Sequence, residues 1–125
     1  MTLLNDLKNF LISKNNNLQN KIAFNFDDYN FNDDKLVLLA KGGEFGSVSQ
    51  KTIVSVIVKN VDMQVAETLI NSVFDSLFPD NQYLKPMDLN GKMTLLIPLQ
   101  PPFYKEKQQD GKHVFSFDLK IVQKK

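Results

Sequence analysis

The chain has no cysteine, no tryptophan and only one histidine, and every basic residue is lysine. Without cysteine it forms no disulfide, no thiolate metal site and no thiol nucleophile. A single histidine leaves no pair of imidazole ligands within one chain for a metal ion. Without arginine there is no guanidinium fork for bidentate binding of phosphate or carboxylate groups. We therefore expect no enzyme activity, no bound metal and no cofactor.

Long apolar runs and a strong charge imbalance are also missing. No apolar run approaches the roughly 20 residues of a membrane span, so we expect no membrane association. The 15 lysines and 14 acidic residues leave a net charge of +1. The lysines are interrupted by acidic residues, so we expect no specific nucleic-acid binding. The length of 125 residues, with 42% hydrophobic and 23% charged residues, predicts one soluble globular domain spanning residues 1–125.

Two segments carry apolar residues at helical spacing. The first runs from Leu3 to Lys14 and stops at three consecutive asparagines. The second follows Asp62, a favourable N-cap residue, and ends at Pro79. In the second segment apolar residues recur every three or four positions, which predicts an amphipathic helix packed on the core.

Five segments have strand patterns, and they cover residues 21–26, 35–41, 51–60, 93–99 and 113–122. The third has β-branched residues on both faces, which favours a central strand. The fifth alternates, with its apolar residues predicted to face inward and Ser116, Asp118 and Lys120 outward. The predicted order is α-β-β-β-α-β-β. A single, mostly antiparallel sheet with two packed helices, an α+β domain, accommodates this order most simply.

The strongest strand and helix stripes are expected to face each other in the core. The residues predicted to be buried together are Val54, Val56, Val58, Leu69, Ile70, Val73, Phe115 and Phe117.

Two connections are candidates for contacts between subunits. Gly42-Gly43 is expected to end the second strand and open a loop over residues 42–50, where glycine allows close approach of a neighbour. Residues 101–112 form a proline-stiffened arm with two aromatic residues and an Asp110-Gly111 turn. The arm either supplies a subunit contact or folds back on its own core. The candidate interface residues are Gly42, Gly43, Phe45, Phe103, Tyr104, Lys105 and Lys107.

Three patterns resemble functional sites but are better explained as structure. The paired acids within residues 27–34 lack the spacing of a calcium loop and indicate a solvated turn. Residues 42–47 lack the Gly-Lys-Ser/Thr ending of a phosphate-binding loop. His113, Ser116 and Asp118 are triad residue types, but in a pleated strand His113 points away from the other two.

Three parts of the sequence, taken together, resemble a known family. A glycine pair follows the second predicted strand, and residues 52–77 run from a strand into an Asp-initiated helix. Residues 101–122 contain proline, an aromatic residue, an acidic–glycine turn and then alternating aromatic residues. This arrangement is similar to the small tail-terminator and minor capsid proteins of long-tailed bacteriophages. The matching positions are Pro102, Tyr104, Asp110, Gly111, Phe115 and Phe117. Where relatives often carry arginine, this chain has Lys105 or Lys107.

The resemblance implies a structural role in the virion. Such proteins form a hexameric ring that caps the tail tube, ends its polymerisation and presents a surface to the head. It implies that this chain is a homo-oligomer with tail tube and head-completion proteins as partners. It would lie in the tail or neck of the virion after synthesis in the host bacterial cytoplasm. The alternatives are a head–tail connector or stopper, another neck protein, or a cytosolic ligand-binding or enzymatic domain.

Overall fold

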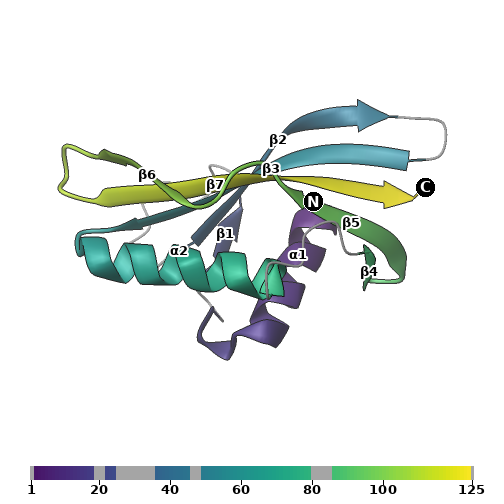
Figure 1. Cartoon of the computed structure of the whole chain (residues 1–125), viewed down its shortest axis with the longest axis horizontal. Coiled ribbons are helices and arrows are strands. Elements are labelled where there is room, and N and C mark those ends of the chain that lie inside the picture. The colour runs from purple at the N-terminus through teal and green to yellow at the C-terminus, as the bar shows by residue number, and fades with distance from the viewer. Residues whose placement is uncertain (1, 19–21, 25–35, 46–48, 80–85, 125) are drawn as a thin grey trace.

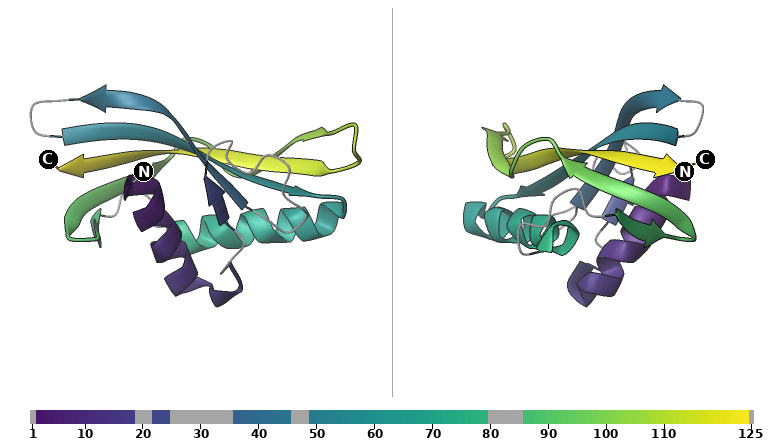
Figure 2. Two further views of the ribbon diagram at one scale, coloured as in Figure 1. Left: turned by 180° about the vertical axis from the view of Figure 1, so that it is seen from behind. Right: turned by 45° about the vertical axis from the view of Figure 1, so that its right-hand side comes forward.

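The computed structural model describes residues 2–18, 22–24, 36–45, 49–79 and 86–124. In chain order the elements are α1 (Thr2–Lys14), the 3-10 turn η1 (Asn16–Leu18), β1 (Ile22–Phe24), β2 (Leu36–Phe45), β3 (Ser49–Asn60), α2 (Met63–Leu77), β4 (Pro86–Leu89), β5 (Lys92–Pro98), β6 (Phe103–Lys107) and β7 (His113–Lys124). Both α-helices lie on the same side of one sheet (Figure 1), and two further views show the same arrangement (Figure 2).

The described strands form one seven-stranded sheet in the order β1-β2-β3-β7-β5-β4, and β6 also pairs with β7. Every pairing is antiparallel except that of β1 with β2, which is parallel. The α+β class with a mostly antiparallel sheet is therefore confirmed. As predicted, β3 is central, because β2 pairs with one of its edges and β7 with the other.

The predicted element order omitted two strands, β4 and β6. β4 lies between the second predicted helix and the strand predicted to begin at residue 93, where no strand was expected, and it forms a hairpin with β5. Asn90 and Gly91 close this hairpin with φ values of 53° and 82°, the left-handed conformation that Asn-Gly turns favour. The carboxylate of Asp88 accepts a hydrogen bond from the Gly91 amide at 2.6 Å. A strand of four residues at the sheet edge is too short to show a clear alternation of apolar and polar residues. Its conformation is therefore determined by pairing with β5, and the sequence alone does not reveal it.

The glycine pair does not end the second strand, contrary to the prediction. β2 continues to Phe45, and its pairing with β3 shifts between Ala40 and Gly43. The irregularity accommodates the two glycines while the hairpin partner keeps the strand extended. Gly42, Gly43 and Phe45 therefore belong to a β-hairpin, and the predicted loop over residues 42–50 is wrong for the described positions. Residues 46–48 and the paired acids of residues 27–34 lie outside the described residues.

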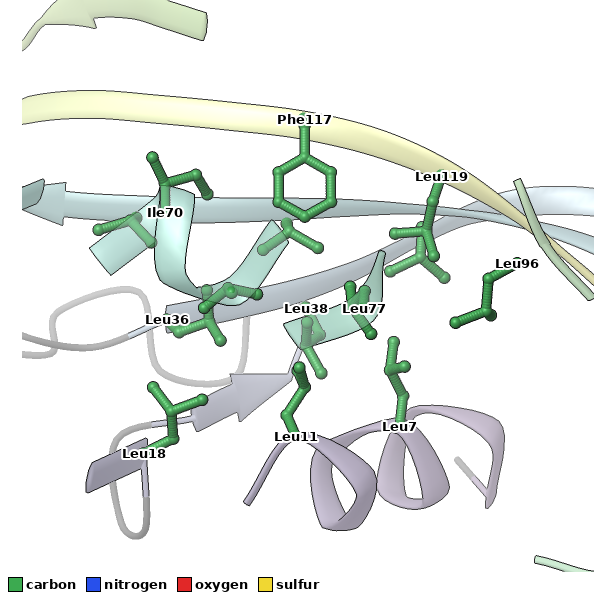
Figure 3. Close-up of a cluster of buried hydrophobic side chains, with 14 of the residues drawn as sticks. Leu7, Leu11, Leu18, Leu36, Leu38, Ile70, Leu77, Leu96, Phe117 and Leu119 are labelled. Carbon is green, nitrogen blue, oxygen red and sulfur yellow. The ribbon is translucent and has the colours of Figure 1, made fainter. Parts of the chain in front are cut away.

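The hydrophobic core lies between the helices and the sheet face that they cover. Phe117 on β7 is fully buried, and its ring meets Phe74 of α2 edge-on, with the ring centroids 5.1 Å apart and the planes at 87°. Leucines of α1 reach the same core from the other helix (Figure 3). Of the eight residues predicted to be buried together, seven are buried, and Leu69 is partly buried at the edge of this cluster.

The start of α2 matches the sequence prediction. Asp62 is the N-cap, and its carboxylate accepts hydrogen bonds from the backbone amides of Gln64 and Val65 at 3.0 and 3.2 Å. At the other end, the amide of Phe78 donates to the carbonyl of Phe74 before Pro79 prevents further helix. Because Asn60 of β3 lies two residues before the cap and pairs with His113, the helix starts beside the first residue of β7.

Candidate functional site: the β6 arm

One edge of β7 is shared by two strands that run in the same direction. β5 pairs with its second half, from Leu119 to Gln123, and β6 pairs with its first half, from His113 to Ser116. Between them, residues 99–102 leave the edge. β5, this excursion and β6 thus form one long strand interrupted by an irregular proline-containing segment. We call residues 99–107 the arm.

The excursion is fixed at its base by backbone contacts to β7. The Leu99 amide donates a hydrogen bond to the Asp118 carbonyl at 2.9 Å, and the Asp118 amide donates to the Gln100 side-chain oxygen at 3.0 Å. The next two residues are prolines, which have no amide to contribute to a ladder. The chain therefore bulges away from β7 here and returns to it at Phe103.

Tyr104 is anchored to its own domain although 41% of its surface is exposed. Its hydroxyl lies 3.0 Å from Nδ1 of His113, within hydrogen-bonding distance. Its ring meets Phe115 edge-on, with centroids 5.2 Å apart and planes at 71°. Two contacts in different directions hold this side chain on the inner face of the sheet, so the alternative in which the arm folds back is correct for Tyr104.

Phe103 lies on the opposite face and has a different environment. It pairs with Ser116, one position away from the Tyr104–Phe115 pair, so the pleat directs the two aromatic side chains to opposite sides. Its side chain is 40% exposed, and among the described residues its ring makes no aromatic contact. Leu99, at the other end of the excursion, is 46% exposed. Two large apolar side chains thus flank the bulge.

The free edge of β6 has features that oppose pairing with another strand. All five of its residues are exposed, and three of them are the charged residues Lys105, Glu106 and Lys107. Its register on β7 also shifts between Tyr104 and Glu106. Charges and bulges on an edge strand oppose pairing of its backbone with a foreign strand. Strand-to-strand pairing at this edge is therefore disfavoured.

The arm charges influence a lysine on the neighbouring strand β3. Burial lowers the pKa of Lys59 below the usual value of 10.5, and the charges of Lys112 and Lys105 lower it further. Asp110 and Glu106 oppose this effect. The hairpin end that joins β6 to β7 is a mixed-charge surface. As predicted, it closes at Asp110-Gly111, where the Asp110 carboxylate accepts from the Lys112 amide and Gly111 has a φ of 89°.

The structure separates the predicted interface residues into two groups. Phe103, Tyr104, Lys105 and Lys107 all lie on β6, whereas the Gly42, Gly43 and Phe45 group lies on β2, across β3 and β7. The sequence prediction missed Leu99, which is exposed at the other end of the excursion from Phe103. The two prolines that follow Leu99 and Gln100 were a detectable signal, because they have no amide to donate and so the strand must leave the ladder just after Leu99.

The triad residue types are not assembled into a catalytic site. His113 contacts Tyr104 on the inner face, whereas Asp118 on the outer face accepts a hydrogen bond from Ser55 at 2.5 Å and pairs with Lys41 at 3.4 Å. Ser116 was expected on a wet face but is buried, because β6 pairs along this part of β7. The described side chains include no cluster of three or more metal-ligating residues. Within the described ranges, no helix is long and apolar enough to cross a membrane.

No protein-family model and no curated protein sequence matches the chain.

Proposed function

We propose that this chain is a tail terminator of a long-tailed phage, a structural subunit whose copies close into a ring. The ring, hexameric as in the family the sequence resembles, would cap the tail tube, stop its polymerisation and present the surface that joins the head. Its partners are other copies of the chain, the tail tube protein and the head-completion proteins. It would act in the virion without catalysis or cofactor, after synthesis in the bacterial cytoplasm.

The observation that carries this proposal is the exposed apolar surface of the arm. Phe103 and Leu99 are 40% and 46% exposed although both are large and apolar. Exposed apolar side chains that lie together, rimmed by charged residues, mark protein interaction sites. Aromatic anchors contribute a large share of the binding energy at such sites. An arm of this kind supports assembly better than it supports a chemical reaction.

The rigidity of the arm supports a repeated contact. A ring closes only when every subunit makes the same contact at the same angle. The hydrogen bonds of Leu99 and Gln100 to β7 fix one end of the excursion, and Tyr104 fixes the other. Because this arm is already ordered in the isolated domain, little conformational entropy is lost when it binds.

The test is a Phe103→Ser substitution, made in the purified protein and in the phage genome. Phe103 lies outside the core, so we expect a folded protein that no longer forms rings by negative-stain electron microscopy. In the phage we expect overlong tails or heads without tails. Met93→Ser, which changes a 60% exposed apolar side chain on β5, is the matched control.

Two outcomes would change the assignment. Rings and tails of normal length in the Phe103→Ser phage would show that the arm is not the contact. Tails of normal length that fail to join heads, with rings disrupted in the purified variant, would favour the head–tail connector or stopper.

A further inference from the structure

The domain has an apolar cavity at the end of α2 that lies farthest from the arm. The cavity has a volume of about 200 Å³ and is bounded by α1, the end of α2, β4 and β5. Its apolar walls come mainly from Phe10, Leu77, Phe78, Met87 and Leu96. A dry apolar cavity of about 150 Å³ is large enough to hold benzene, so this one has room for a phenyl ring.

The cavity and the arm lie at opposite ends of the molecule. α2 begins beside His113, the residue that pairs with the outer end of β6, and ends at the cavity wall. Its 15 residues span roughly 22 Å. Figure 1 shows β6 toward one end of the sheet and α1 with β4 toward the other, and Figure 2 agrees. Phe103 therefore cannot enter the cavity of its own chain.

We propose that this cavity receives the Phe103 side chain of a second copy of the chain. The inference rests on the proposed ring, and it names the two surfaces that would meet at each joint. Phe103 is the one to insert, because Tyr104 is already held by His113 and Phe115. A contact between two different surfaces of identical subunits is heterologous. It continues from copy to copy and yields a ring if the rotation closes.

The charges around the cavity and on the arm support the same contact between two copies. Lys14 lines the cavity, and its ammonium group lies 5.5 Å from the centroid of the Phe10 ring. On the arm, Glu106 pairs with Val114 and Phe103 with Ser116, two positions apart on β7, so both side chains lie on one face. Because the register of β6 shifts between Tyr104 and Glu106, the two residues lie roughly 7 Å apart along the edge of β7. With Phe103 inserted, the Glu106 carboxylate would meet Lys14 at the rim of the cavity.

The absence of cysteine allows a direct cross-linking test. Lys14→Cys and Glu106→Cys are combined in the full chain and treated with a short bis-maleimide, which reacts only at the introduced thiols. Both positions are exposed, so folding is preserved. We expect a ladder of covalent oligomers on a denaturing gel, running from the dimer to the complete ring. Each single-cysteine variant has no second thiol at the joint, so it is expected to give no ladder and, with one thiol per chain, at most a dimer.

Two further variants make the test specific. Lys107→Cys with Lys14→Cys moves the thiol one residue along β6, onto the face of His113, and is expected to give no ladder. Phe103→Ala in the Lys14→Cys/Glu106→Cys background is expected to reduce the cross-linked fraction by about tenfold, because it removes the anchor.

The outcomes separate this inference from the proposed function. If electron microscopy shows rings but no ladder forms, or if the Lys107→Cys control gives an equal ladder, the cavity is not the seat of Phe103 and the ring proposal stands. If the wild-type chain remains a monomer at every concentration and its loss leaves phage tails unchanged, both proposals are wrong.

Discussion

Replacing Phe117 by alanine tests the account of the core most directly. The side chain lies in the middle of β7 and is fully buried between the sheet and α2. Its ring meets Phe74 edge-on at 5.1 Å, in a geometry that favours aromatic pairs. Alanine would leave a ring-sized cavity among side chains held by both helices and by β3, with little freedom to collapse.

The expected cost is about 4 kcal/mol of unfolding free energy, within the range of about 3–5 kcal/mol for buried phenylalanine. This is a large fraction of the roughly 5–15 kcal/mol that stabilises a domain. With a urea dependence of about 2 kcal/mol per molar, the midpoint should fall by about 2 M. Circular dichroism in urea, at a concentration where the protein is monomeric, measures the shift. The exposed Met93→Ala control should stay within about 0.5 kcal/mol of wild type.

A midpoint that falls by less than about 0.5 M, with an unchanged slope, would refute this placement of Phe117. A double-mutant cycle with Phe74→Leu isolates the ring contact, for which we expect a coupling of about 0.5–1.5 kcal/mol. Additive effects of the two substitutions would show that the rings do not interact.

Three further substitutions test separate features of the fold. Val56→Asp puts a carboxylate at a fully buried position of β3, which costs several kcal/mol of unfolding free energy. Far-ultraviolet circular dichroism should therefore show an unfolded protein, and unchanged melting would contradict the central placement of this strand. Asp62→Ala removes the N-cap of α2 and should cost about 1 kcal/mol in urea unfolding, with no change if the cap is unimportant. Gly111→Ala should lower the unfolding free energy by about 1 kcal/mol, because the φ of 89° is unfavourable for alanine. No steric cost is added, since the new Cβ would meet no atom within 4 Å.

The elements with strong periodicity could be predicted from the sequence. The alternation in β3 and β7 and the helical stripe of α2 each extend over many residues, so local pattern and tertiary burial agree. Asp62 and Asp110-Gly111 were also correctly assigned, because a cap and a turn depend on neighbouring backbone groups. In these places the interactions that determine structure lie within a few residues.

The errors arose where a distant partner decides the structure. Gly42-Gly43 has poor strand propensity, but pairing with β3 keeps these residues in β2 and a register shift absorbs the mismatch. β4 and β6 have only four and five residues, too few to show a clear alternation, and each becomes a strand because a longer neighbour offers it hydrogen-bonding groups. Prediction from the local sequence pattern alone therefore assigns such segments to loops.

The candidate site was predictable only in part for the same reason. Two adjacent aromatic residues after Pro101-Pro102 indicated an arm that either contacts a subunit or folds back on its own core, but the sequence did not distinguish the roles of the two rings. That distinction depends on where the chain rejoins β7 after the excursion. Phe103 meets Ser116 and Tyr104 meets Phe115, so a shift of one residue would exchange the exposed and anchored rings.

β7 contributes both to the hydrophobic core and to the position of the arm. On its inner face Phe117 packs against α2, and two residues earlier Phe115 supports Tyr104. Tyr104 in turn fixes the register that directs Phe103 outward. Loss of the Tyr104 contacts would therefore weaken the proposed assembly by loosening the arm, whereas loss of Phe103 would remove the proposed anchor from an arm that is still ordered. Because β6 pairs with the edge of this rigid core strand, each copy of the chain would present Phe103 in the same geometry, as the proposed ring requires.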